Sequence, residues 1–282
     1  MNRTTLVLVV GACIRSLVSF SCIAVACLMN DLDRISIVMV HTTDSGNLGS
    51  AARAMKTMGI HDLRLVAPED SPDTAKAIAR ASGAADLLLA ARQFDTLEEA
   101  LADCSLVFGA SARKRTIPWP LITPPVMADL VLKEPVEGRV AVLFGREDNG
   151  LTNEELSLCH YHVTIPCSDE YCVLNVSQAI QVICYQLRQS LVERPKGEEA
   201  ALDTGSFGLR EWDAPPATGE EMERFFRHLE ETLVALEFLK HENPGQLMTR
   251  MRRMFGRIRP DHMEVNVLRG VLTAMQKKLR GQ

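Results

Sequence analysis

The chain has 282 residues, of which 46% are hydrophobic, and it carries a formal net charge of −5. This length suits one substantial domain and a smaller one, because single cores seldom grow beyond about 250 residues. The acidic balance excludes a uniformly basic coat for nucleic acid, so any such contact must be a local patch. Eight cysteines occur without a C-x-x-C pair, which is more typical of free thiols in a reducing cytosol than of a disulfide framework. We therefore expect a cytoplasmic protein.

Residues 1–30 form an apolar extension that has three interpretations. Two are a signal peptide and a membrane anchor, and the third is a translation start at Met29. Arg15 divides the apolar run into pieces shorter than the roughly 20 residues that span a bilayer. We favour the start at Met29, because polar residues and the first predicted strand follow it directly. On this interpretation the protein makes no contact with a membrane.

Apolar runs alternate with helical patterns in the next part of the chain, which we assign to one domain at residues 31–192. The patterns predict strands at residues 35–40, 63–66, 86–89, 106–109, 140–144 and 161–165, and helices at 51–58, 74–81, 96–102 and from 175 onward. Residues 41–50 are rich in turn formers and are predicted as a loop. This alternation is typical of an α/β fold with a mainly parallel sheet.

The remainder of the chain changes character twice. Residues 193–217 are rich in Pro, Gly, Glu and Asp and lack apolar periodicity, so they are predicted as a linker. Helical spacing then predicts a small helical unit at residues 218–282, with breaks at Pro244 and Pro260. Between residues 246 and 282, nine Lys and Arg oppose two acidic residues. This basic tail is either a solvated helix face or a contact for nucleic acid.

Two predicted strands end in polar or glycine-containing loops, at residues 145–150 and 166–175. Ligands bind at such junctions in α/β folds, and parallel strands would bring both loops to one edge of the sheet. The first loop lacks the Lys and Ser or Thr of a P-loop, and no G-x-G-x-x-G occurs in the chain. The sequence therefore predicts a small-molecule pocket that lacks these two nucleotide-binding fingerprints.

Cations lie beside two predicted loops. Arg53 lies one turn inside the helix behind Asn47-Leu48-Gly49-Ser50, where backbone N–H groups and a guanidinium could face an anion. An arginine at such a place is more often structural. Arg113, Lys114 and Arg115 follow the strand predicted at 106–109. They are either a contact for phosphates of a nucleic acid or part of a solvated loop.

Cysteine and histidine gather in one short stretch, which raises the question of zinc. The residues are Cys159, His160, His162, Cys167 and Cys172. Their spacing fits no common zinc finger or ribbon. We favour a buried thiol and structural histidines, and we expect no metal.

Three motifs resemble those of the SPOUT (SpoU) ribose 2′-O-methyltransferases. They are Asn47-x-Gly-Ser-x-x-Arg53, Phe144-Gly-Arg-Glu147-x-x-Gly-Leu-Thr-Asn-Glu-Glu155 and Leu174-Asn175-x-x-x-Ala179, in this order. More narrowly, Ser-Ala-Arg-Lys-Arg-Thr-Ile-Pro-Trp-Pro from Ser111 and the Arg-rich helix after Asn243-Pro-Gly are similar to the TrmJ type of tRNA enzyme. That type methylates the ribose of nucleotide 32 in the anticodon loop.

The resemblance implies a trefoil knot at the end of the α/β domain, in which S-adenosyl-L-methionine binds. The implied cofactor contacts are Ala110, Ser111, Gly145, Arg146, Gly150, Ile165 and Leu174. The implied catalytic residues are Asn47, Arg53, Glu147 and Asn175. For tRNA we assign Arg113, Arg115, Arg250, Arg252 and Arg253. Members of the family act as homodimers, so Arg53 of one subunit is expected to meet the methyl donor bound by the other.

One position departs from the family pattern. The family commonly has Ser immediately before the Leu-Asn of the third motif, and this chain has Val173 there. Valine has no hydroxyl, so a substrate contact through that group is missing. Two alternatives therefore stand beside a tRNA methyltransferase: a related enzyme that acts on ribosomal RNA, and an RNA-binding protein that has lost turnover.

Overall fold

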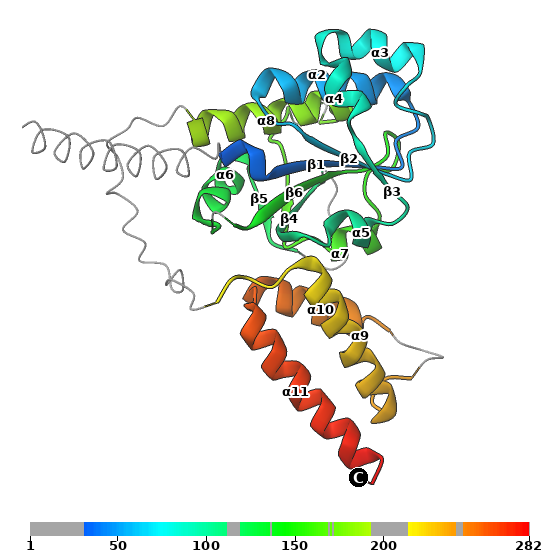
Figure 1. The fold of residues 1–282 in the computed structure, drawn as a ribbon, viewed down its shortest axis with the longest axis vertical. Coiled ribbons are helices and arrows are strands. Elements are labelled where there is room, and N and C mark those ends of the chain that lie inside the picture. The colour runs from blue at the N-terminus through cyan, green and yellow to red at the C-terminus, as the bar shows by residue number, and fades with distance from the viewer. Residues whose placement is uncertain are drawn as a thin grey trace, which may run out of the picture.

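The computed structural model (Figure 1) describes residues 31–111, 119–135, 137–168, 170, 172–192, 214–240 and 245–281. Within these residues seven strands form one sheet in the order β3-β2-β1-β6-β4-β7-β5. Every neighbouring pair is parallel, which confirms the predicted parallel sheet. The strands are β1 (Ile35–Val40), β2 (Asp62–Val66), β3 (Arg92–Phe94), β4 (Cys104–Ala110), β5 (Leu121–Ile122), β6 (Arg139–Phe144) and β7 (Tyr161–Val163).

Helices cover both faces of the sheet, so its central strands are apolar on both sides. Figure 1 shows α2 (Ser45–Met58), α3 (Ala75–Ala81), α4 (Ala85–Leu89) and α8 (Val176–Val192) on one face, and α5 (Leu97–Leu101) and α7 (Asn153–Ser157) on the other. Alternate residues of β1 enter different cores: Ile37 packs with the α2 and α8 core, and Val38 with the α5 and α7 core. Helix α6 (Pro124–Lys133) completes the first core.

The strand predicted at residues 86–89 is wrong. This segment is helix α4, and the strand lies a few residues later, at β3. Leu87 and Leu88 are buried, whereas Leu89 is 57% exposed, so the leucine run covers one face of a short helix. Strand β3 escaped prediction because it lies at the edge of the sheet and its residues Arg92 and Gln93 are exposed.

Helix α2 begins earlier than the sequence indicated. Residues 45–50, predicted as loop, form its first turns, and Asp44 caps it by accepting a 2.7 Å hydrogen bond from the N–H of Gly46. Gly49 is required inside this helix, because a Cβ there would lie 2.0 Å from the carbonyl oxygen of Ala77 on α3. The small polar residues that suggested a loop therefore permit close packing between two helices.

A helical unit follows the sheet domain and confirms the predicted helical C-terminal part. It contains α9 (Gly219–Ala235), α10 (Leu247–Ile258) and α11 (His262–Leu279), which share their own apolar core. The unit packs on the α5 and α7 side of the sheet (Figure 1), where a Cβ on Gly219 would lie 2.5 Å from the carbonyl oxygen of Leu101. Arg259 joins the same unit to Glu134 through a 2.5 Å ion pair.

Several expectations concern residues outside the described part of the chain. They are the apolar extension at residues 1–30 and most of the linker, residues 193–213. Residues 214–217 pack with the helical unit, since Ala217 is buried and Pro216 pairs with Asp261. Among the described residues, no helix combines the length and apolar character needed to cross a bilayer. The knotted threading implied by the resemblance stays a prediction.

Candidate functional site

A cavity of about 320 Å³ opens at the carboxyl ends of three adjacent strands, β6, β4 and β7. Three loops enclose it: the end of β4, the loop between β6 and α7, and the segment between β7 and α8. The residues predicted as cofactor contacts all line it, namely Ala110, Ser111, Gly145, Arg146, Gly150, Ile165 and Leu174. The resemblance thus selected residues of three separate loops that meet at one cavity in the structure; their contact with the cofactor stays a prediction.

Two glycines determine the shape of the loop after β6. A Cβ on Gly145 would lie 2.2 Å from the carbonyl carbon of Gly150, so no other residue fits there without moving the backbone. Gly150 adopts a left-handed φ of 66° and donates its N–H to the carbonyl oxygen of Arg146 at 2.9 Å. The loop therefore folds tightly on itself and presents backbone groups to the cavity.

Arg146 is held in place beside this cavity by an ion pair. Its Nη1 lies 3.0 Å from Oε1 of Glu155. Glu155 also forms a capping box with Thr152 at the start of α7. One carboxylate thus orders both the helix and the arginine, which fixes where the guanidinium lies.

A chain of hydrogen bonds connects three of the four residues predicted as catalytic. Asn175 Nδ2 donates to Asn47 Oδ1 at 3.0 Å, and Asn47 Nδ2 donates to Glu147 Oε1 at 2.8 Å. Ser177 donates its N–H and its hydroxyl to Asn175 Oδ1, at 2.9 Å and 2.7 Å. These bonds connect the start of α2, the loop after β6 and the start of α8.

Thr43 is a functional neighbour that sequence reasoning missed. Its hydroxyl and its N–H donate to Oε2 of Glu147 at 2.9 Å and 3.2 Å. Partial burial raises the pKa of Glu147, but the hydrogen bonds from Asn47 and Thr43 outweigh this effect and hold the pKa below its ordinary value of 4.5. The sequence did contain an indication, since Thr43 follows β1, whose neighbour in the sheet is β6.

Arg53 is exposed on α2 and is not among the residues that line this cavity. It lies instead in a second hollow of about 310 Å³ between α2, α3 and α8, which we call the arginine hollow. Its lining consists of two arginines and mostly small or neutral polar side chains: Ser50, Arg53, Ala54, Thr57, Arg80, Ser177, Gln178 and Gln181. Since Ser177 lines the hollow and Glu147 lines the cavity, the hydrogen-bond chain connects the two.

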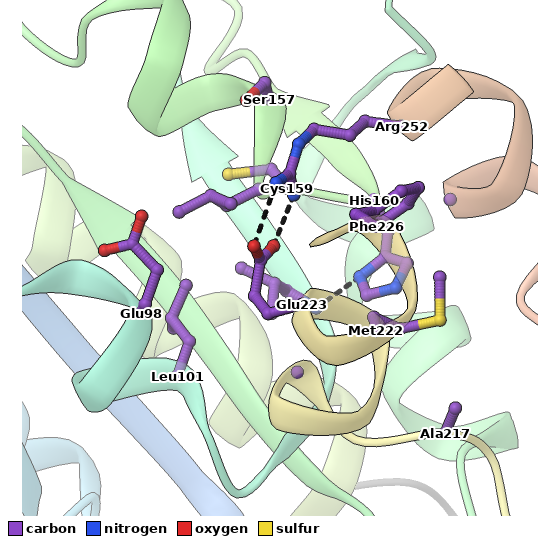
Figure 2. A pocket seen from close by; sticks show the side chains of 14 residues that line it. Glu98, Leu101, Ser157, Cys159, His160, Ala217, Met222, Glu223, Phe226 and Arg252 are labelled. Atoms are coloured by element: carbon purple, nitrogen blue, oxygen red, sulfur yellow. Dashed lines mark hydrogen bonds and ion pairs between the residues drawn. The ribbon is translucent and has the colours of Figure 1, made fainter. Parts of the chain in front are cut away.

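The residues predicted to contact RNA have different surroundings. Arg113 and Arg115 lie outside the described residues. Arg250 is exposed and Arg253 is half-buried on α10. Figure 2 shows that Arg252 points toward Glu223, with which it forms a bidentate ion pair, and its guanidinium carbon lies 4.5 Å from the ring centre of Phe226. Arg252 is therefore engaged within the helical unit, and its contact with RNA stays a prediction.

The same view covers a small cavity of about 50 Å³ where the helical unit meets the sheet domain (Figure 2). His160 lies there, and its Nδ1 accepts a 3.0 Å hydrogen bond from the N–H of Val107. Burial, together with the charge of Arg259, lowers the pKa of His160 to about 3, so the ring is neutral. His162 stacks on Trp119 with ring centres 5.4 Å apart. Within the described residues, no three potential ligands are placed to hold a metal.

The fold and the cavity define a class of protein: an α/β domain with a ligand site at the carboxyl edge of a parallel sheet, extended by a helical unit. Residues 34–185 match the SpoU rRNA Methylase family, and residues 220–282 match the family described as tRNA methyltransferase TrmJ, C-terminal domain. The chain belongs to the SpoU methylase family.

Several relatives match this chain over nearly their whole length. The tRNA (cytidine/uridine-2′-O-)-methyltransferase TrmJ of Klebsiella pneumoniae is 46% identical over 254 residues, which cover 89% of this chain and all of that protein. Its counterpart in Escherichia coli K12 is 45% identical over 251 residues, covering 89% of this chain and 98% of that one. The crystal structure of TrmJ from Z. mobilis superposes with a TM-score of 0.73 at 32% identity, over 86% of this chain and 99% of that one.

Proposed function

We propose that this chain methylates the 2′-hydroxyl of a ribose in tRNA, at a cytidine or uridine, with S-adenosyl-L-methionine as the methyl donor. The observation that carries the proposal is the cavity that the loops of the second and third motifs enclose together with the end of β4. Relatives that bear this activity in their names match almost the whole chain. Nucleotide 32 of the anticodon loop is the proposed target, on the resemblance to the TrmJ type.

The residues of the cavity fit such a cofactor. Its volume of about 320 Å³ lies within the range of roughly 300 to 1,000 Å³ that is usual for small-ligand sites. Gly145 allows backbone groups to approach closely, and apolar side chains such as Leu151 and Val163 face the same space. We assign binding to Ala110, Ser111, Gly145, Arg146, Gly150, Ile165 and Leu174. When bound, the cofactor supplies a methyl group activated on a sulfonium.

Arg53 is the proposed catalytic residue on the substrate side. A guanidinium stays protonated at neutral pH, so it is a poor general base. It can instead donate hydrogen bonds to the ribose oxygen as negative charge develops there, which lowers the barrier electrostatically. Asn47, Glu147 and Asn175 support this chemistry by fixing the loops between the hollow and the cavity.

A homodimer explains why Arg53 lies outside the cavity of its own subunit. In the proposed dimer, Arg53 of one subunit reaches the cavity of the other. Mixing subunits tests this directly. Arg53→Ala and Gly145→Ala should each be inactive alone, and activity should reappear when the two are unfolded and refolded together, because the mixed dimer contains one intact pairing. Mixed dimers without activity would contradict the arrangement.

The proposed reaction is tested by incubating the purified protein with labelled S-adenosyl-L-methionine and either total tRNA or ribosomal RNA. We expect label in tRNA, at a 2′-O-methyl group that maps to nucleotide 32. Label only in ribosomal RNA would support the related enzyme instead. Cofactor binding without transfer to either RNA would support a binding protein, in keeping with Val173, which is 65% exposed at the cavity and has no hydroxyl.

A further inference from the structure

The arginine hollow contains a second cation that none of the sequence motifs includes. Arg80 on α3 lines it together with Arg53, and no carboxylate is among the described residues that line the hollow. Ser177 and Gln181 on α8 add neutral donors. Two guanidinium groups beside neutral donors favour an anion, and phosphate suits the planar fork of arginine.

Close packing of α2 against α3 brings the two arginines together. Gly49 makes it possible, since a Cβ there would lie 2.0 Å from the carbonyl oxygen of Ala77. Arg53 follows Gly49 by one helical turn, and Arg80 follows Ala77 by nearly one turn, so both side chains emerge beside the contact. The Cγ of Arg80 lies 3.7 Å from the position of a Cβ on Gly46. The backbone contact between α2 and α3 thus determines that both arginines line the same hollow.

Neither guanidinium is engaged by another residue that the structure describes. Across the part of the chain that the structure describes, the guanidinium groups of Arg53 and Arg80 form no hydrogen bond and no ion pair of 4.0 Å or less. The nearby carboxylate of Asp44 forms an ion pair with Lys76, whose Nζ lies 2.6 Å from it. Arg80 influences Asp44 only through the longer-range electrostatic effect of its charge. Both arginines therefore keep their hydrogen-bond donors for a ligand.

The hollow also connects to the cofactor cavity. Ser177, on its wall, donates to Asn175, and the chain of hydrogen bonds continues through Asn47 to Glu147 in the cavity. Arg53 lies on this same wall. A phosphate in the hollow would thus be held beside the arginine that is proposed to act on the ribose.

We propose that Arg80, together with Arg53, binds a backbone phosphate of the RNA next to the target ribose. This inference rests on the proposed function, because an RNA strand is the anion in question. Arg80 binds the strand and does not touch the reacting atoms. Its loss should therefore weaken RNA binding while the rate at saturating RNA is kept, whereas the loss of Arg53 should abolish the rate.

The test measures binding of an unmodified tRNA transcript to the full chain at several salt concentrations, without cofactor. Arg80→Ala should raise the Kd about tenfold, as expected for the loss of one charged hydrogen bond. It should also make the slope of log Kd against log salt shallower by about 0.7, the value for one phosphate of a single strand. Arg80→Lys should restore the slope. Arg224→Ala, which removes an equal charge from an exposed pair with Glu220, is the control.

The outcomes distinguish failure of the phosphate site from failure of the proposed reaction. If Arg80→Ala binds the transcript with the affinity and slope of the wild type, the phosphate site is wrong even where the wild type methylates tRNA. If the wild type fails to methylate tRNA but Arg80→Ala still flattens the slope, the proposed reaction fails and the phosphate site stands. If the wild type binds no tRNA, both are overturned.

Discussion

The side-chain amide of Asn47 donates a 2.8 Å hydrogen bond to Glu147, 100 positions further along the chain. This bond joins the first turn of α2 to the loop after β6, so helix and loop form one wall between the cavity and the arginine hollow. Thr43 completes the set of donors around the same carboxylate. The position of this wall therefore depends on a charged acceptor at residue 147.

Glu147→Gln should weaken binding of S-adenosyl-L-methionine about tenfold, since hydrogen bonds to a charged group contribute roughly 1.5 kcal/mol or more. Glutamine replaces one carboxylate oxygen with an NH2 group, which then faces another donor, either Asn47 or Thr43. Titration calorimetry measures the effect, with Glu154→Gln on the exposed face of α7 as the control. Equal affinity in Glu147→Gln and wild type would show that the wall does not depend on this carboxylate.

Three glycine-to-alanine variants should give three different results. Gly145→Ala places a Cβ 2.2 Å from the backbone of Gly150 and should abolish cofactor binding. In Gly150→Ala the new Cβ meets no atom, but alanine must adopt the left-handed φ of 66°. This strain should lower the free energy of unfolding by about 1 kcal/mol. Gly256→Ala lies in open space inside α10 and should raise the free energy of unfolding by up to about 1 kcal/mol. Cofactor titration and urea unfolding distinguish the three, and normal binding by Gly145→Ala would refute the account of the loop.

Asp62 should make the fold sensitive to acid. Burial raises its pKa, but hydrogen bonds from Arg92 and Ser36 and the charge of Arg64 outweigh this and hold the pKa below its ordinary value of 3.8. A lowered folded-state pKa adds stability that is present above 3.8 and is lost as the pH falls toward the folded-state value. Asp62→Asn should cost about 2 kcal/mol at neutral pH, because the buried Arg64 loses one of its two carboxylate partners and keeps Asp103.

The measurement for Asp62 is urea unfolding across a pH series from neutral to acid. The free energy of unfolding of the wild type should decrease as the pH falls below the ordinary pKa of an aspartate. That of Asp62→Asn should decrease less steeply over the same pH range. Asp86→Asn breaks a pair with Lys56 that is exposed to solvent, so its curve should follow the wild type. Parallel curves for Asp62→Asn and wild type would rule out this source of acid sensitivity.

Arg259→Gly should loosen the helical unit from the sheet domain. Arg259 has a left-handed φ of 52° that glycine accepts without strain, so the variant removes the whole side chain, with its guanidinium, and leaves the backbone unstrained. The side chain of Glu134, almost fully buried, then keeps only the hydroxyl of Ser105 as a side-chain partner among the described residues, which should cost about 3 kcal/mol. Hydrogen exchange should rise in α9 to α11. Unchanged exchange would mean that packing alone holds the unit.

Much of the α/β domain could be predicted because its central strands are continuous apolar runs. Residues 35–40 matched β1 fully, and the polar loops after β6 and β7 pointed to the edge where the cavity lies. The loops gather there because parallel strands end at the same edge. The pattern of strands and loops therefore pointed to the edge that holds the cavity, and the resemblance supplied the proposed chemistry.

What escaped prediction depended on contacts between distant residues. Small polar residues at 45–50 read as a loop because their helical role appears only when α3 packs on Gly49. The ion pair of Arg252 with Glu223 on another helix could not be predicted from local charge. Arg80 belongs to no motif, and only the folded chain places it beside Arg53.

The most direct test of the account compares the wild type with Arg53→Ala in two assays on the same samples, cofactor affinity and methyl transfer to tRNA. We predict that both bind S-adenosyl-L-methionine equally, because the residues assigned to the cofactor are unchanged and Arg53 is proposed to act on the ribose, and that only the wild type forms a 2′-O-methylated nucleotide. Transfer by Arg53→Ala at the wild-type rate would contradict the central claim, that this guanidinium acts on the ribose hydroxyl.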